Sequence, residues 1–391
     1  MSNREEALRI HEEVRGKLSI TSKLPITNSQ ELALAYTPGV AEPCKEIAKN
    51  PADSYRYTSR GNLVAVISDG SAVLGLGNIG PLASMPVMEG KAVLFKEFSG
   101  VDAFPLVINE SDVDRFVAIV KSLEFSFGGI NLEDISAPRC FEIERRLKEE
   151  LDIPVFHDDQ HGTAIVVVAA LLNSLKVVKK DLSTVKVVLN GPGAAGTAII
   201  KLLQAFGVTD IIACDEHGIL GSDTTIEMEN HKQALAETTN PRQIKGDLAT
   251  ALVDADVFIG VSVAGAVTPA MVRSMASDPV VFAMANPVPE IMYDEAIENG
   301  VKVMGTGRSD FPNQINNVLA FPGIFKGALS VQAKDINEEM KVAAAKAIAS
   351  LVSEEELSAE YIIPNPFDPR VAETIAQAVA QTAIATNVVR K

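Results

Sequence analysis

The chain of 391 residues contains no tryptophan, only three cysteines and few aromatic side chains, which make up 5% of the residues. The cysteines, Cys44, Cys140 and Cys214, are odd in number and far apart, and they lie in apolar or helical surroundings. This pattern indicates reduced core thiols rather than a disulfide framework, and it makes a catalytic cysteine the less favoured interpretation. We therefore expect a cytoplasmic protein.

Positive charge is scarce: 35 lysines and arginines stand against 51 acidic residues, and the formal net charge is −16. The basic residues are scattered, so no cluster could follow a phosphate backbone, and nucleic acid is excluded as a partner. The N-terminal stretch MSNREEALRI lacks the apolar segment of a secretory signal. No window approaches the 18 apolar residues of a membrane span, so we expect no membrane partner either.

Hydrophobic residues make up 47% of the chain, which is typical of a well-buried globular protein, and the length fits two domains. From about residue 62 to 175, short apolar runs alternate with helical patterns, which predicts βαβ units on a mostly parallel sheet. A second series begins at VKVVLN (185–190) and predicts a doubly wound nucleotide-binding domain. The predicted fold is α/β, with an N-terminal domain (1–176), a Rossmann-type domain (177–332) and a C-terminal helical segment (333–391). The apolar stripe of that segment must pack on the first domain or on a partner subunit.

Two stretches have the spacing G-x-G-x-x-G of a dinucleotide-binding loop, GLGNIG (75–80) and GPGAAG (191–196). Only the second has the full context: a preceding strand, an uninterrupted helix, a second strand, and the acidic Asp215 about 20 positions on. Its glycines let the backbone approach a pyrophosphate at the helix N-terminus. The residues expected to bind the cofactor here are Gly191, Pro192, Gly193, Ala194, Ala195 and Gly196.

Asp215 is expected to accept hydrogen bonds from the ribose hydroxyls and to repel a 2′-phosphate. No lysine or arginine lies between Asp215 and Lys232. NAD is therefore favoured as the cofactor, with NADP as the alternative.

The first glycine loop is followed by Pro81 and Pro86, which would interrupt a helix that leaves the loop directly. We expect a turn, and then a helix capped near Ser84 with Pro86 in its first turn. The glycines of this loop indicate either a tight crossing between strand and helix or the approach of the backbone to something other than a pyrophosphate.

Lys91 lies on the apolar side of a predicted helix, among Val87, Met88, Leu94, Phe95 and Phe98. Its ammonium group either reaches the rim while its stem covers apolar surface, or is held in a desolvated site. Desolvation lowers the pKa of a lysine and makes it usable as a general base. This feature alone favours neither alternative.

Two acidic pairs follow successive predicted strands: Glu133 and Asp134, and then Asp158 and Asp159. A single pair is usually a solvated loop or a helix cap. Ligand sites of open α/β sheets gather at the carboxyl ends of strands, however, so the two pairs can converge. Several carboxylates in one cleft favour Mg²⁺ or Mn²⁺ over zinc.

The segment HDDQH (157–161) also has the histidine spacing of a zinc hydrolase motif. That motif requires both histidines on one helical face. Here His157 follows the strand run IPVF and the helix begins around Gly162, so we reject the hydrolase interpretation.

Seven stretches together resemble the malic enzymes, in particular their short prokaryotic form, and cover nearly the whole chain in the family's order. They are LAYTPGVAEPC (34–44), SDGSAVLGLGNIGPLASMPVMEGKAVLFKEFSGVDAFP (68–105), INLEDISAPRCFEIE (130–144), PVFHDDQHGTA (154–164), NGPGAAG (190–196), ANPVPE (285–290) and QINNVLAFPGIFKGAL (314–329). The resemblance implies oxidative decarboxylation of L-malate to pyruvate and CO₂ with NAD(P)⁺ and Mg²⁺ or Mn²⁺. It also makes the first domain the substrate and metal domain.

The resemblance further implies roles for individual residues. The metal ligands correspond to Glu133, Asp134 and Asp159, with Asp158 as the acidic residue beside them. Lys91 corresponds to the general base, with a pKa lowered by burial and by the cation, and Tyr36 to the general acid. Asn286 and Asn317 correspond to the asparagines that hold nicotinamide and substrate near the metal.

The sequence departs from the long, eukaryotic-type malic enzymes at Ala72, where those enzymes carry an arginine that binds the substrate carboxylate. The short form shares this difference, so the residue that binds the C4 carboxylate stays unidentified. The chain is also too short for a phosphotransacetylase-like C-terminal domain, so we expect no allosteric control through one. We expect a homo-oligomer, with a homodimer as its simplest form.

Two alternatives stay open at this point. One is a metal-independent NAD-dependent dehydrogenase of two domains, similar to the amino-acid dehydrogenases. The other is a nucleotide sensor without catalytic activity. Dependence of activity on a divalent cation, and formation of NADH from malate, would distinguish a malic enzyme from both.

Overall fold

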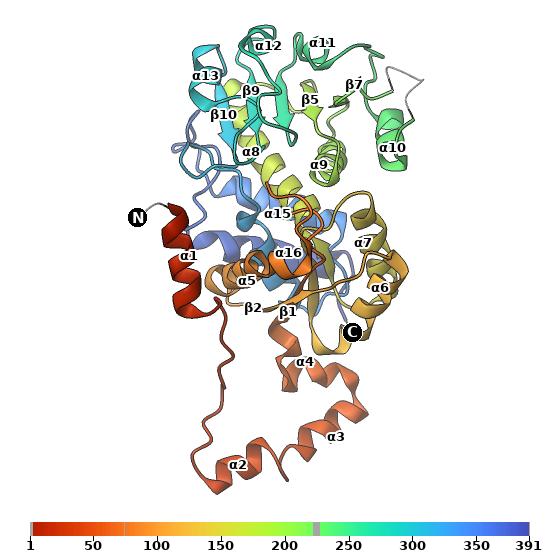
Figure 1. Cartoon of the computed structure of the whole chain (residues 1–391), viewed down its shortest axis with the longest axis vertical. Helices are drawn as coiled ribbons and strands as arrows, with labels where there is room; N and C mark the ends of the chain where they lie inside the picture. The colour runs from red at the N-terminus through yellow and green to blue at the C-terminus, as the bar shows by residue number, and fades with distance from the viewer. Residues whose placement is uncertain (1–2, 74, 222–226, 391) are drawn as a thin grey trace.

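The chain forms two β-sheets in succession, each covered by helices (Figure 1). The structure is a computed structural model that describes residues 3–73, 75–221 and 227–390. The first sheet has the order β2-β1-β3-β4, and all its neighbouring strands are parallel. Its strands are β1 (Leu63–Ser68), β2 (Asp102–Val107), β3 (Gly129–Leu132) and β4 (Val155–His157).

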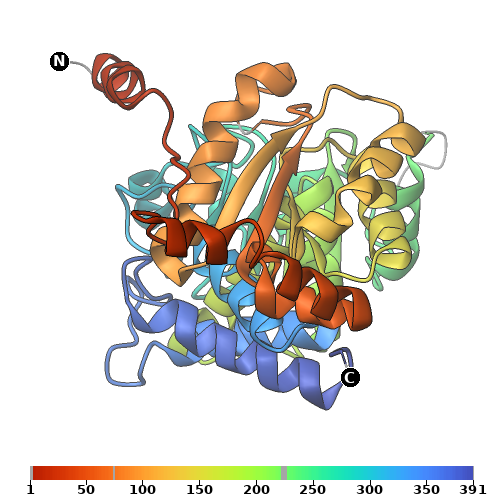
Figure 2. The ribbon, with the colours of Figure 1, turned by 90° about the horizontal axis from the view of Figure 1, so that it is seen from below.

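Both faces of the first sheet are buried, as is usual for parallel sheets. Side chains alternate along β1: Val64 and Val66 pack with α5 and α8, whereas Ala65 and Ile67 pack with α6 and α7. Figure 2 shows α5 and the α6–α7 pair on opposite sides of the sheet. The covering helices are α5 (Gly80–Ser99), α6 (Val113–Ser122), α7 (Arg139–Glu150) and α8 (Thr163–Val178).

The second sheet has the order β10-β9-β8-β5-β6-β7, and all its pairs are parallel except the two-residue β7. This is the Rossmann order, in which the direction of winding changes between β5 and β8. The predicted α/β fold with a doubly wound nucleotide domain is therefore confirmed. The strands are β5 (Lys186–Asn190), β6 (Asp210–Asp215), β7 (Gly218–Ile219), β8 (Val257–Gly260), β9 (Val280–Ala283) and β10 (Val303–Thr306). Its helices are α9 (Ala194–Ala205), α10 (Asn230–Thr238), α11 (Leu248–Leu252), α12 (Pro269–Arg273) and α13 (Tyr293–Glu298).

The helix α8 continues directly from a π-helical turn, η4 (Asp158–Gly162), and contacts both α9 and β9 of the nucleotide domain. Together Asp158–Val178 are long and apolar enough to cross a membrane by length and composition. Our prediction that no window approaches this limit is therefore wrong. The apolar window of this helix is 67% buried inside the protein, because most of α8 lies in the core that the two domains share.

The C-terminal helices α14 (Phe321–Ser330), α15 (Glu338–Ser350) and α16 (Arg370–Ala385) pack back on the helices of the first sheet. The ring of Phe95 on α5 meets Phe321 and Phe325 edge to face, with ring centroids 4.7 and 5.4 Å apart. The helix α16 packs on α14 and α15, and α15 packs on α8. The C-terminal segment therefore buries its apolar stripe within this chain.

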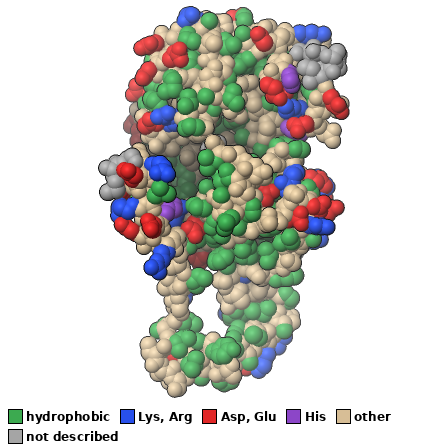
Figure 3. Space-filling view, viewed as in Figure 1, with side chains coloured by type: hydrophobic (Ala, Val, Ile, Leu, Met, Phe, Trp, Pro, Cys, Tyr) green, Lys and Arg blue, Asp and Glu red, His purple; other side chains and the backbone are tan. Residues whose placement is uncertain are grey.

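The N-terminal arm, residues 18–57, leaves the body as an open loop and returns at the start of β1 (Figure 1). Figure 3 shows an opening between this arm and the body. The helices α1 (Asn3–Val14), α2 (Ser29–Ala35) and α3 (Ala41–Lys49) contain no buried residue, and neither does the short α4 (Ser54–Tyr57). Cys44 on α3 is exposed, so our expectation of a core thiol is wrong there, whereas Cys140 and Cys214 are buried.

The helix α5 begins at Gly80, directly out of the first glycine loop, and contains Pro86. Our prediction of a turn followed by a helix capped near Ser84 is therefore wrong. The reason is that Pro81 occupies the first helical turn, where a backbone N–H has no helical partner to lose. The hydroxyl of Ser84 donates to the carbonyl oxygen of Pro81 within the helix, at 2.8 Å.

Candidate active site

The two acidic pairs leave the first sheet side by side. The strands β3 and β4 are parallel neighbours, and Leu132 lies beside His157 in their register. The residues that follow these two positions are Glu133 and Asp134 on one strand and Asp158 on the other. Sequence reasoning anticipated this convergence because the carboxyl ends of parallel strands share one edge.

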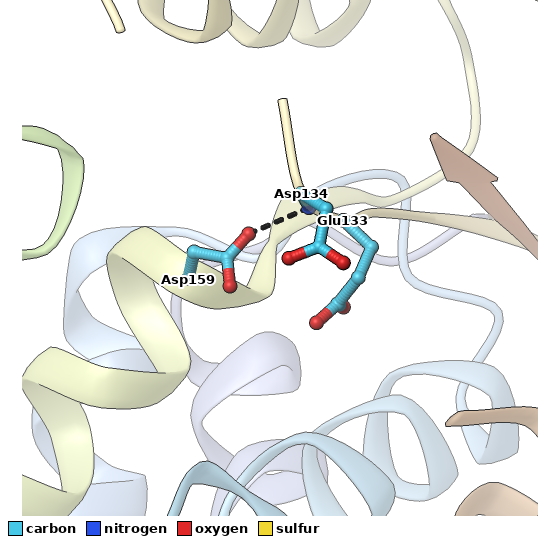
Figure 4. Close-up of side chains that lie close together, drawn as sticks. All are labelled: Glu133, Asp134 and Asp159. Atoms are coloured by element: carbon cyan, nitrogen blue, oxygen red, sulfur yellow. Dashed lines mark hydrogen bonds between the residues drawn. The ribbon is translucent and has the colours of Figure 1, made fainter. Parts of the chain in front are cut away.

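Glu133, Asp134 and Asp159 each offer an oxygen atom, and these atoms lie within 4.8 Å of one another (Figure 4). The backbone N–H of Asp134 donates to Asp159 Oδ2 at 2.8 Å, and Asp134 adopts a positive φ of 54° that turns the chain sharply there. Within the described ranges this is the one group of three or more such ligands close enough to hold a metal ion.

Lys91 reaches this cluster from α5. Its Nζ lies 2.8 Å from Glu133 Oε1 and 2.5 Å from Asp158 Oδ2, and 4.2 Å from the ring centroid of Phe321. The side chain of Asn317 donates to the same Asp158 oxygen at 2.6 Å. The lysine on the apolar side of its helix is thus held in a desolvated site, at 7% exposure.

Burial raises the pKa of each carboxyl in this cluster, because the surroundings solvate the charged form poorly. The pKa of Asp134 is about 9, that of Glu133 and of Asp158 about 7, and that of Asp159 about 6. Burial by itself would lower the pKa of Lys91, but the charges of Asp158 and Glu133 outweigh it and raise that pKa. The expected lowering of the Lys91 pKa is therefore not found in the protein alone.

The cluster fits a hard divalent cation. All its donors are carboxylate oxygens, and Asp134 Oδ2 is buried without a hydrogen-bond partner. A cation among Glu133, Asp134 and Asp159 would neutralise charges that burial otherwise makes unfavourable. Zinc with the two histidines of HDDQH does not fit, because His157 ends β4 whereas His161 lies in the π-helical turn, hydrogen-bonded to Glu144.

The loop between β5 and α9 has the close contacts that require glycine. A Cβ on Gly191, whose φ is +100°, would lie 2.4 Å from the carbonyl oxygen of Val261. A Cβ on Gly196 would lie 2.2 Å from the carbonyl oxygen of Gly191, so this glycine lets α9 pack closely on β5. Gly193 stands at the N-terminus of α9 with free space around it.

Beside this loop is a cavity of 420 Å³ at the carboxyl ends of β5, β6 and β8. Asp215 lies on its wall, as the fingerprint predicts, but so does Lys232, whose Nζ donates to Asp215 Oδ2 at 2.9 Å. Sequence reasoning missed this contact because the intervening chain turns back through β7 and brings α10 beside β6.

A second cavity, of 560 Å³, lies between the two sheets and connects the glycine loop 191–196 with the acidic cluster. Its walls include Ala72, Gly75, Asp159, Ala194, Ala195, Asn286 and Asn317. A Cβ on Gly75 would lie 3.7 Å from the backbone oxygen of Asn286. The first glycine loop therefore lies on this interdomain cavity and not on the cavity beside Asp215.

The structure does not bring Tyr36, the expected general acid, to the cluster. It follows α2 in the N-terminal arm and is 68% exposed. The arm rejoins the body at Leu63, where β1 begins, whereas the acidic cluster lies at the other end of the sheet. Figure 1 accordingly shows α2 far from α5.

The fold and the site together define a nicotinamide-dependent oxidoreductase with a Rossmann-type cofactor domain and a carboxylate–lysine centre. Similarity to known proteins specifies the class of enzyme further. The family model "Malic enzyme, N-terminal domain" matches residues 15–148, and "Malic enzyme, NAD binding domain" matches residues 160–384. The chain belongs to the malic enzyme family, and it catalyses the oxidative decarboxylation of malate with a nicotinamide dinucleotide.

Individual relatives agree with this assignment. The bifunctional malic/malolactic enzyme of Bacillus subtilis is 62% identical over 100% of this chain and 95% of its own length. The NAD-dependent malic enzyme of Geobacillus stearothermophilus is 58% identical over 97% of this chain and 79% of its own. The crystal structure of the malic enzyme from Pyrococcus horikoshii is 52% identical and covers 99% of this chain and 92% of its own, with a TM-score of 0.95.

Proposed function

We propose that Lys91 and the carboxylates around it carry out this reaction on L-malate in the 560 Å³ cavity, with a divalent cation held by Glu133, Asp134 and Asp159. The observation that supports this most is the contact of the Lys91 ammonium with Glu133 and Asp158, next to a cavity that also reaches the cofactor loop. A cation bound there would supply a Lewis acid that polarises the C2 oxygen of the substrate.

A bound cation would neutralise the carboxylates that hold the extra proton on Lys91. That proton would leave to solvent, and the neutral amine would then take the proton of the C2 hydroxyl. A bound nicotinamide would supply the acceptor for the hydrogen of C2, taken as hydride. The bond to the C4 carboxylate then breaks, CO₂ leaves, and the electron pair stays on C3 and the C2 oxygen as an enolate. Tyr36 gives a proton to C3, which completes pyruvate. Asp158 orients the lysine because it accepts a hydrogen bond from Lys91 Nζ, and Asn317 orients Asp158 because it donates to the same oxygen. Asn286, on the cavity wall, holds the nicotinamide end of the cofactor.

The direct test is a spectrophotometric assay with L-malate, Mn²⁺ and either NAD⁺ or NADP⁺. We expect reduced cofactor to form, activity to be lost in EDTA, and Mn²⁺ to restore it. Pyruvate should accumulate in the same molar amount as the reduced cofactor. Full activity in EDTA would contradict the metal site, and an absence of reduced cofactor would contradict the proposed role of the centre.

The same assay addresses the choice of cofactor. Asp215 disfavours a 2′-phosphate, but its pairing with Lys232 reduces the negative charge that a phosphate would meet. We therefore propose that NAD⁺ is preferred and that NADP⁺ is also used. Relatives with the names NAD-dependent and NADP-dependent malic enzyme both match this chain at 49% identity or more.

The N-terminal arm supports a homodimer in which each copy supplies Tyr36 to the other. Its helices α2 and α3 have 7 and 9 residues and bury nothing within this chain, and such short helices are not stable by themselves. Side chains that would normally be buried are exposed along the arm: Ile20, Leu24, Ile26, Leu32 and Leu34. A second copy with the same arm would cover these side chains by symmetric exchange.

Charge is compatible with that exchange. The whole chain carries a net charge of −16, which makes two copies repel each other, but the arm contains as many basic as acidic residues. The basic residues are Lys23, Lys45, Lys49 and Arg56, and the acidic ones are Glu31, Glu42, Glu46 and Asp53. The arm is thus apolar and neutral, as the central part of a protein interface usually is.

The domain limits at residues 176 and 332 and the cytoplasmic location are also part of the proposal. Each sheet lies on one side of residue 176, and the helices that follow residue 332 are α15, which packs on α8, and α16, which packs on α14 and α15.

A further inference from the structure

Three buried polar side chains form a hydrogen-bonded network behind the π-helical turn that carries Asp158 and Asp159. Its members come from three separate elements: Glu144 from α7, His161 from the turn itself and Lys341 from α15. Glu144 is 6% exposed and Lys341 is 3% exposed. Neither side chain contacts the substrate cavity or belongs to the acidic cluster, so the reaction described above does not use them.

Glu144 holds the turn at both of its ends. Its Oε1 accepts the backbone N–H of His157 at 3.2 Å, and its Oε2 lies 2.9 Å from His161 Nε2. These two contacts stand on either side of Asp158 and Asp159 in the chain. One carboxylate therefore fixes the segment from which both acidic side chains project.

Lys341 determines which ring nitrogen of His161 carries the proton. Its Nζ lies 3.1 Å from His161 Nδ1, and an ammonium group can only donate, so Nδ1 is the acceptor. The proton of the neutral ring is then on Nε2, which donates to Glu144. Without Lys341, the ring could carry its proton on Nδ1. The lone pair of Nε2 would then face the carboxylate of Glu144, and their hydrogen bond would be lost.

The burial of Lys341 is unfavourable for stability alone. An ammonium group loses hydration when it is buried, and apolar residues of the same size usually pack there at lower cost. Its partner Glu338, at 2.6 Å, is 63% exposed and compensates only in part. The lysine also lies three, four and seven positions before Ala344, Ala345 and Ile348, on the buried face of α15.

We propose that Lys341, His161 and Glu144 are positioning residues that orient Asp159 toward the metal and Asp158 toward Lys91. This inference rests on the proposed metal site. A π-helical turn is wider than the α-helix that follows it and is frequently found at functional sites. Contacts at both of its ends are what keep two consecutive aspartates directed at two different partners, Asp134 and Lys91.

The test is direct Mn²⁺ binding to the purified full-length protein without substrate, from the electron paramagnetic resonance signal of free Mn²⁺. We expect Lys341→Met to weaken Mn²⁺ binding by about tenfold, as is common when a group behind a metal ligand is lost. The control is Lys346→Met, an exposed lysine on the same helix, which should bind Mn²⁺ like the unmodified protein. NAD⁺ binding should be unchanged in both variants.

A second pair of variants separates hydrogen bonding from packing. His161→Gln keeps a donor for Glu144 and should bind Mn²⁺ more tightly than His161→Leu, which has none. This pair carries the test if Lys341→Met does not fold. Unchanged Mn²⁺ affinity in Lys341→Met, or equal affinities in the His161 pair, would overturn the inference. Absence of Mn²⁺ binding in the unmodified protein would instead overturn the metal site itself.

Discussion

Lys91 and its neighbours show how burial and charge oppose each other at single residues. Burial raises the pKa of all four carboxyls of the cluster, and the charges of Asp158, Glu133 and Asp159 in turn raise the pKa of the lysine. The position of Lys91 on an apolar helix face left two alternatives open, a lysine that reaches the rim and a desolvated one, and the structure shows the desolvated one. The direction of its pKa was not predictable, because that direction depends on how many carboxylates lie within contact distance.

The pKa values of the acidic cluster predict how metal binding stabilises the protein at different pH. Asp159, Glu133 and Asp134 have pKa values of about 6, 7 and 9, all above their ordinary values. Between pH 6 and 8 the folded protein therefore holds more protons than the unfolded chain, and the free energy of unfolding of the metal-free form falls as the pH rises. Lys91 stays charged in both states over this range. Because Mn²⁺ binds the deprotonated groups, the increase in Tm caused by Mn²⁺ should be larger at pH 8 than at pH 6. Calorimetry with EDTA or Mn²⁺ measures this, and equal increases at both pH values would contradict it.

At the scale of elements, sequence context was informative where it specified several features at once. The strand, loop, helix and acidic residue around GPGAAG predicted the strand–loop–helix–strand unit of β5, α9 and β6 correctly, because each feature restricts the same backbone path. The start of the helix after GLGNIG was predicted wrongly. A proline such as Pro81 is compatible both with an interruption of a helix and with its first turn, and here it lies in the first turn. Lys341 has the same position on an apolar helix face as Lys91, and that signal could have identified it.

The cofactor loop allows a prediction that separates folding from binding. Gly196→Ala places a Cβ 2.2 Å from the carbonyl oxygen of Gly191, so α9 must move away from β5, at a cost of about 1–3 kcal/mol in the free energy of unfolding. Gly193→Ala meets no atom within 4 Å and has an ordinary φ of −80°, so it should leave the stability of the cofactor-free protein unchanged. Thermal unfolding without cofactor measures both variants. A decrease in Tm of the same size in each would contradict the role assigned to Gly196.

At the scale of the whole molecule, the two residues that we propose as base and acid lie in two parts of the fold. Lys91 is buried in the body, whereas Tyr36 lies exposed in the N-terminal arm. The sequence matched both residues to one site but could not place the arm, because its short apolar helices would look the same whether they packed on their own body or on another copy. The exposure of the arm is what favours exchange between copies.

Exchange of arms predicts that two inactive variants restore each other. Lys91→Ala and Tyr36→Phe should each lose malate turnover while binding NAD⁺. In a mixed dimer, the copy that keeps Lys91 receives an intact Tyr36 from its partner, so one of the two sites is complete. After co-refolding in equal amounts, half of the dimers are mixed, and the specific activity should be about a quarter of that of the unmodified enzyme.

The control is Tyr57→Phe, which changes another exposed tyrosine of the arm and should remain active alone. A mixture of Lys91→Ala and Tyr36→Phe that stays inactive, while analytical ultracentrifugation shows a dimer, would mean that each arm serves its own body. Full activity of Tyr36→Phe alone would instead show that Tyr36 is not the proton donor. Arm exchange would then be tested by the oligomeric state alone. Recovery of activity only after mixing can arise in one way, since neither variant contains both groups: Tyr36 of one copy must reach the C3 position of a substrate bound beside Lys91 of the other.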